Sequence, residues 1–227
     1  MSTLRQSQLR VSRAEEKLSD LKLEINLARQ DALQVAAEQA DLEAMQMPLN
    51  KFSGALWDEA RLLISEFAFH ARVALDYVVF ALARRDTGIE QEDTQFPINE
   101  SPEAFARNGK KGGCLEHLTV EHRTMIERFQ PYQGFRLHCL RTLHKLSNSD
   151  KHRYLAHVGF TGMGWQDPAL NTQPPAVGFT QMEVNISRRF EILLHDAGVE
   201  AEDALKTLTD ILAKVREIVD DFDRVLG

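Results

Sequence analysis

Long apolar runs and cysteines are both scarce in this chain. No stretch of about 18 consecutive apolar residues is present, so the sequence predicts no membrane-spanning helix. The N-terminal residues MSTLRQSQLRVSRAEEK lack the apolar core of a signal peptide. The 2 cysteines among 227 residues, Cys114 and Cys139, have neither CxxC spacing nor a secreted context, which favours reduced thiols. We therefore expect a cytoplasmic protein with no membrane partner.

Positive charge is also in short supply, because 27 Lys and Arg stand against 34 Asp and Glu, for a net charge of −7. Indiscriminate binding to nucleic acid needs a surplus of Lys and Arg, so RNA could be bound only through a local basic patch. A hydrophobic fraction of 43% is ordinary for a soluble globular protein. No shift in composition marks a second domain, and we treat residues 1–227 as a single helical domain.

Motifs that carry metal, nucleotide or hydrolase chemistry are missing as well. The 8 histidines include no HExxH and no closed zinc spacing. Glycine-rich phosphate loops and a GxSxG nucleophile turn are absent, and the few aromatic residues show no RNA-reading pattern. The sequence therefore predicts no metal and no cofactor.

Helical periodicity dominates what is present. Residues 1–47 read as one long heptad helix that ends before Pro48. Its apolar seam recurs every seven residues, at Leu4, Val11, Leu18, Ile25 and Ala32, with Ala14, Leu21, Ala28, Val35 and Leu42 at the second position. Four further leucines lie outside this seam, namely Leu9, Leu23, Leu27 and Leu33. We therefore expect packing partners on more than one side of the helix.

The rest of the chain continues as helices with one interruption. Residues 56–155 should supply the central helices, the first of them apolar on most of its circumference up to Arg85. Gly88 is placed to cap that helix, and Ser101 followed by Pro102 should begin a short one. Two more helices are expected at roughly 120–129 and from near Phe135. Within residues 157–195 one part is rich in Gly and Pro and another alternates apolar and polar residues, which predicts a small β element. Residues 200–226 are again predicted to be helical.

The predicted fold class is therefore mainly α. We expect an antiparallel bundle of five or six helices with a long N-terminal helix and a small β insertion before the C-terminal helix. The seam of that last helix could meet the N-terminal one, and the long amphipathic termini favour a homodimer.

The first polar constellation lies in LSNSDKHRYL, residues 146–155. If the helix from Phe135 continues this far, one of its faces carries Arg141, Lys145, Asn148 and His152. Such a stripe could bind a phosphate or carboxylate while His152, with a reference pKa of about 6.5, exchanges a proton. Alternatively, the segment is a polar joint between helices. Asn148 and Asp150 would then cap it and pair with Lys151 and Arg153.

The second constellation lies in FHARVALDY on the apolar central helix. Arg72 and Asp76 are four residues apart, which suits an ion pair within the helix, whereas His70 and Tyr77 lie on another side. Charged groups on so apolar a helix are expected to be partly buried, and a buried charge must be paired. A structural ion pair and a functional site both fit this pattern.

Four motifs in order resemble a widespread, uncharacterised bacterial helical family. These are FHARVALDYVVFAL, TQFPI, IERFQPY and LRTLHKLSNSDKHRYL, and members of that family carry HNLRxALDH, TQFPI, QPY and NxDKHR. The resemblance covers about Glu15 to Leu155. That family is in turn similar to the HEPN superfamily of helical bundles, many of which are dimeric ribonucleases of bacterial defence and toxin systems.

The HEPN resemblance implies an Arg that steadies the scissile phosphate and a His four to six residues later that assists attack by the 2′-OH. Arg72 and His70 match HNLRxALDH, but Tyr77 stands where the motif has its final His. His152 could take the missing role if folding brings it beside Arg72. We therefore expect His70, Arg72 and Asp76 to meet Asn148, Asp150, His152 and Arg153 in one polar pocket or network.

Three functions follow as hypotheses. The first is an HEPN-like, RNA-acting protein of a bacterial defence or stress system, either a metal-independent ribonuclease or a degenerate one. The second is a non-catalytic helical scaffold that binds a partner or a second copy of itself. The third, less favoured by the residues, is a small-molecule pocket. A catalytic role requires Arg72 and His152 to face a cleft that solvent reaches, whereas a scaffold allows them to be buried and mutually paired.

Overall fold

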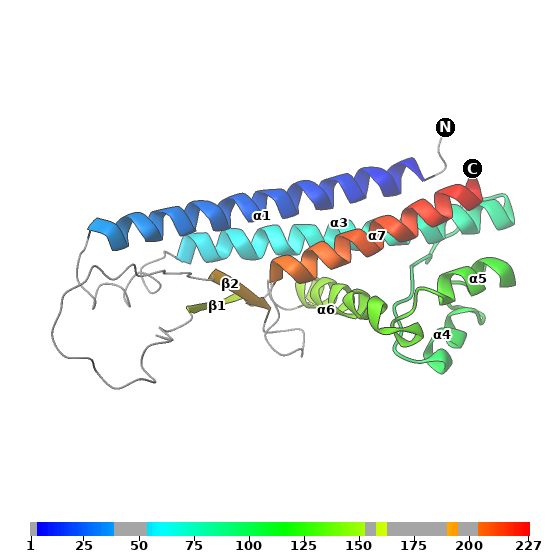
Figure 1. Ribbon diagram of the computed structural model, residues 1–227. Helices are drawn as coiled ribbons and strands as arrows, with labels where there is room; N and C mark the ends of the chain where they lie inside the picture. The colour runs from blue at the N-terminus through cyan, green and yellow to red at the C-terminus, as the bar shows by residue number, and fades with distance from the viewer. Residues whose placement is uncertain (1–3, 39–53, 153–157, 163–189, 195–203) are drawn as a thin grey trace.

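The computed structural model describes residues 4–38, 54–152, 158–162, 190–194 and 204–227. It is mainly helical, which confirms the predicted fold class at that level (Figure 1). The elements in chain order are α1 (Arg5–Glu38), α3 (Gly54–Thr87), α4 (Pro102–Asn108), α5 (Val120–Glu127), the short 3-10 helices η1 (Pro131–Gln133) and η2 (Phe135–Leu137), α6 (His138–His152), β1 (Val158–Gly162), β2 (Phe190–Leu194) and α7 (Ala204–Leu226).

Three long helices lie side by side, with α1 along one edge of the molecule and α4, α5 and α6 toward the opposite edge (Figure 1). The ion pair between Lys17 and Glu66, at 2.8 Å, shows how α1 runs against α3. A hydrogen bond from Gln8 to Asp223, at 3.0 Å, does the same for α7. From Arg10 to Lys17 on α1, the partner on α3 falls from His70 to Glu66. From Gln8 to Glu15, the partner on α7 falls from Asp223 to Arg216. Helix α1 is therefore antiparallel to α3 and α7.

The heptad seam of α1 is buried within the chain. Leu4, Val11, Leu18 and Ile25 are all inaccessible or nearly so, as are Ala14 and Leu21. This seam faces α3 and α7, so the predicted meeting of the N-terminal and C-terminal seams is confirmed. The apolar face predicted for the central helix is buried as well, at Ala60, Leu63, Ile64, Phe67, Ala71, Ala74, Leu75, Val78 and Leu82.

Local capping signals decide where several helices begin and end. Gly88 follows α3 with a φ of +77°, a left-handed conformation that glycine adopts without steric cost, and its N–H reaches the Arg84 carbonyl at 2.9 Å. The Ser101 side chain accepts a hydrogen bond from the Ala104 N–H at 3.2 Å, ahead of Pro102 at the start of α4. Both caps confirm the prediction from sequence.

Two short strands, β1 and β2, pair antiparallel with Val158 opposite Leu194 and Gly162 opposite Phe190. The remainder of the predicted β element, residues 163–189, lies outside the described residues. Among the helices that the structure describes, none is long and apolar enough to cross a membrane.

Candidate functional site

Arg72 and Asp76 project from α3 onto the backbone of the TQFPI loop. The Arg72 guanidinium donates to the Phe96 carbonyl, and the Asp76 carboxylate accepts from the Phe96 N–H at 2.9 Å. Arg72 and Asp76 also form an ion pair at 3.2 Å, as their spacing of four residues predicts. Together the two side chains bind both polar groups of one peptide residue, whose own phenyl ring is fully buried. We call this arrangement the Phe96 clamp.

The clamp is closed to solvent on its Arg72 side, where the residue is 3% exposed. Burial lowers the pKa of Arg72, and the charge of Asp76 opposes that shift. One guanidinium nitrogen, Nη1, is buried without a hydrogen-bond partner. Since an uncompensated buried charge is costly, Asp76 and the Phe96 carbonyl are what make the buried guanidinium tolerable.

Gln130, in the QPY motif, holds the next part of the same loop. Its side-chain oxygen accepts from the Asn99 N–H at 2.9 Å, and its side-chain nitrogen donates to the carbonyls of Pro97 at 2.9 Å and Ile126 at 3.3 Å. Gln130 is fully buried, so each of these bonds satisfies a group that water does not reach. The motifs ALDY, TQFPI and QPY therefore contact one another through hydrogen bonds to loop backbone.

His70 lies on a different side of α3, against α1. Its Nδ1 is 3.0 Å from the Arg10 guanidinium. The same guanidinium lies 5.6 Å from the centre of the Phe69 ring and 5.9 Å from that of Tyr77. Burial lowers the pKa of His70, and the Arg10 charge lowers it further. His70 is thus an acceptor in the α1–α3 contact and does not share the surroundings of Arg72.

Tyr77 lies in the same α1-facing cluster. Arg72 and Tyr77, which stand at the positions of the Arg and His expected of an HEPN motif, therefore contact different neighbours. Arg72 contacts Phe96, whereas Tyr77 lies against Arg10. The structure therefore brings Arg72 and Asp76 together but separates both from His70 and Tyr77.

Only part of the polar stripe predicted on α6 has side chains that the structure describes. Arg141 forms an ion pair with Glu100 at 3.0 Å, and Asn148 lies 3.0 Å from His144. Lys145 is half-buried. The side chains of Asp150, Lys151 and His152, together with Arg153, lie outside the described residues, as does their predicted meeting with α3.

One polar pair was missed at the sequence level. Asp86, at the end of α3, accepts hydrogen bonds from the Thr119 N–H at 2.7 Å and from His122 at 2.8 Å. Burial opposes its charge, but these two bonds outweigh that effect and leave the pKa of Asp86 lowered. These two hydrogen bonds connect the start of α5 to the end of α3. No local pattern could have found it, because Asp86 and Thr119 are far apart in the chain.

The cysteines and metal ligands add no further site. Cys114 and Cys139 are half-buried thiols that are not joined in a disulfide, and burial raises the pKa of Cys139 to about 11. No group of three or more His, Cys, Asp or Glu that could hold a metal ion occurs among the described residues.

Comparison with known proteins finds no matching family model, no matching curated protein and no matching solved structure.

Proposed function

We propose that this chain is a non-catalytic helical interaction protein, and that the polar residues of its motifs stabilise the fold. The observation that carries the proposal is the Phe96 clamp. Arg72 is 3% exposed and its guanidinium is held by Asp76 and by a backbone carbonyl. A catalytic role requires Arg72 to face a cleft that solvent reaches, whereas a scaffold role allows it to be buried and paired.

A ribonuclease of the HEPN type would need the same guanidinium to contact a phosphate. To do so, Arg72 would have to leave the carbonyl of Phe96 and its ion pair with Asp76. Breaking a buried charge pair costs about 3–5 kcal/mol, which opposes such a movement. Tyr77, at the position of the expected base, lies against Arg10, so a proton acceptor beside Arg72 would have to come from elsewhere in the chain.

The charge distribution supports the same proposal. The chain has a net charge of −7, and Arg141, one of the residues expected to bind phosphate, is paired with Glu100. A surface that binds RNA mainly through its phosphates needs several cations that are not already neutralised.

An RNA cleavage assay tests the proposal. The purified protein is incubated with mixed RNA, with and without divalent metal, beside a variant carrying Arg72→Ala and His152→Ala. Arg128→Ala, which alters an exposed arginine, serves as the matched control. We expect no cleavage by any of the proteins and a lower melting temperature for the double variant alone. Cleavage by the wild type and by Arg128→Ala that is lost in a folded double variant would overturn the proposal and support the ribonuclease hypothesis.

A further inference from the structure

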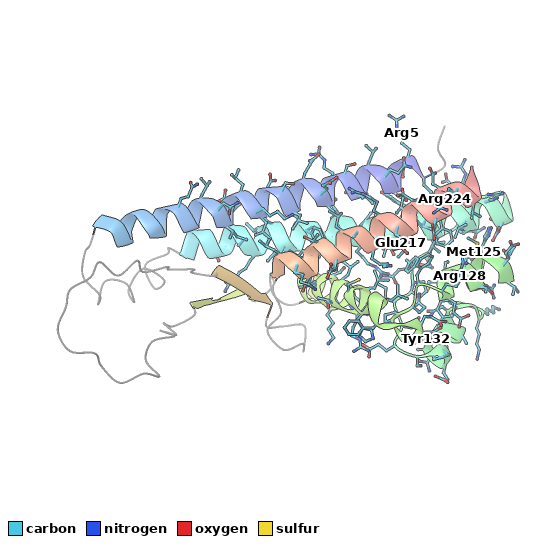
Figure 2. The ribbon with its side chains drawn as sticks, viewed as in Figure 1. Arg5, Met125, Arg128, Tyr132, Glu217 and Arg224 are labelled. Atoms are coloured by element: carbon cyan, nitrogen blue, oxygen red, sulfur yellow. The ribbon has the colours of Figure 1, made fainter. Side chains whose placement is uncertain are left out.

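The outer face of α1 is its side opposite the buried seam, and its middle row is Leu9, Glu16 and Leu23, spaced by seven residues. Leu9 and Leu23 are each 57% exposed, and Leu27 beside them is 45% exposed. Figure 2 shows Arg5, from the same helix, pointing away from α3 and α7. Leucines that share one face of a helix give that face an apolar component that a partner can cover.

A dimer cannot form through the apolar seam of α1, because that seam is already occupied. Leu4, Val11 and Leu18 are buried against α3 and α7 of the same chain. If the long N-terminal helix binds a second copy, it must use its outer face.

The outer face is complementary to itself when a second copy is laid antiparallel across it. In a symmetric antiparallel pair, each residue on one helix meets the residue equally far from the axis on the other. With the axis at Glu16, Leu9 of one copy meets Leu23 of the other, and the converse contact repeats it. On one flank of the same register Arg13, three residues from the axis, lies near Asp20 of the second copy, four residues from the axis, and this contact also occurs twice.

The flank of the outer face that carries Ser12 and Ser19 can be dehydrated at low cost. Ser12, four residues from the axis, would lie near Ser19 of the second copy, three residues from it, and both hydroxyls already donate within their own helix. Ser12 donates to the Gln8 carbonyl at 3.1 Å, and Ser19 to the Glu15 carbonyl at 3.0 Å. Because these donors are satisfied, loss of water leaves no unpaired hydroxyl proton. Their small side chains also allow two helices to approach closely.

The charge at the centre of this arrangement is compensated within each copy. Two Glu16 carboxylates would lie near the axis, and like charges repel. Each is bound to Arg13 of its own chain at 2.5 Å, and both side chains are well exposed, so Arg13 can contact Glu16 and the approaching Asp20 together. Along this face the order is apolar Leu9, positive Arg13, negative Asp20 and apolar Leu23. An antiparallel copy places apolar side chains opposite apolar ones and each positive charge near a negative one.

From this pattern we propose that a second copy of this chain docks antiparallel on the outer face of α1, with Leu9 on Leu23, Arg13 beside Asp20 and Glu16 at the axis. This inference rests on the proposed interaction function and names its partner.

Sedimentation velocity of the full chain over a range of concentrations tests the proposal. The wild type should shift from 25.8 kDa toward twice that mass as concentration rises. Leu9→Glu and Leu23→Glu should each weaken dimerisation at least about tenfold, because each substitution puts charge into both symmetric contacts. Val120→Glu, which alters an equally apolar and more exposed residue on α5, should leave it unchanged.

The register has its own test. Glu16→Cys, at the axis, should give a disulfide-linked dimer under mild oxidation. Glu59→Cys, exposed on α3, and the wild type with its native thiols should not. A monomer at all concentrations, a dimer that the two leucine substitutions leave intact, or a dimer that Glu16→Cys does not cross-link would each overturn the inference. Those outcomes leave the RNA result untouched, so failure of this dimer is distinguishable from failure of the proposed function.

Discussion

At the scale of single residues, Arg72 and Asp76 illustrate how an ionisable group on an apolar helix can serve structure. Their spacing predicted an ion pair correctly. It could not predict that both would also bind the backbone of Phe96, since the path of a loop depends on contacts between residues distant in sequence. The prediction that His70 lies beside Arg72 was wrong for a local reason, because a two-residue step turns a helical side chain to another face.

His70 should make the stability of the fold depend on pH. Its pKa is lowered in the folded state, so the unfolded chain takes up a proton first as pH falls below about 6.5. The contribution of His70 to the free energy of unfolding should therefore be constant above that pH, decrease below it, and level off once the folded form is also protonated.

Urea unfolding at a series of pH values between about 8 and 5 measures this effect. His70→Asn, which keeps an acceptor for Arg10 without titrating, should flatten the slope. His117→Asn, on an exposed residue, is the matched control and should retain it. Equal slopes for wild type and His70→Asn would show that Arg10 and burial do not act on this ring as described.

At the scale of elements, capping signals located several helix ends because they act over a few residues. Ser101, Pro102 and Gly88 were identified from sequence and occupy the expected places. The hydrogen bond from the Thr119 N–H to Asp86 was not, since Asp86 belongs to another helix. A local signal is visible in a sequence, whereas a tie between elements requires the fold.

Gln130 should hold the second half of the TQFPI loop in place. Gln130→Ala removes three hydrogen bonds and leaves the buried Pro97 carbonyl and the half-buried Asn99 N–H without this partner, which should cost about 1–3 kcal/mol of unfolding free energy. Amide hydrogen exchange at Asn99 should also become faster. Gln95→Ala, an exposed glutamine in the same loop, is the control and should change neither quantity. If both variants behave alike, the buried amide does not hold the loop.

At the scale of the whole molecule, the heptad pattern was the most informative feature of the sequence. It predicted the long helix and the residues that bury it against α3 and α7. It also marked Leu9, Leu23 and Leu27 as additional apolar surface, and these are exposed on the outer face of α1. What periodicity could not reveal is whether the seam packs within one chain or between two, because both arrangements bury the same positions.

Two members of the Phe96 clamp were predictable from the sequence, but their role was not. Arg72 and Asp76 were identified because charge is unusual on an apolar helix, and the expected resemblance to HEPN proteins implied a catalytic role for Arg72. The geometry supports another meaning, in which ALDY, TQFPI and QPY connect α3 to the loop and to α5. Residue types suggest chemistry, but burial and partners decide whether that chemistry is accessible.

The central claim is that Arg72 and Asp76 stabilise the fold as a unit, and a double-mutant cycle of equilibrium unfolding tests it most directly. Arg72→Leu alone should lower the free energy of unfolding by about 3–5 kcal/mol, because it removes the buried partner of the ion pair with Asp76. The variant carrying Arg72→Leu and Asp76→Leu should lose less than the sum of the two single losses, with a coupling of at least about 1 kcal/mol. Additive losses, or an Arg72→Leu variant as stable as the wild type, would contradict the account.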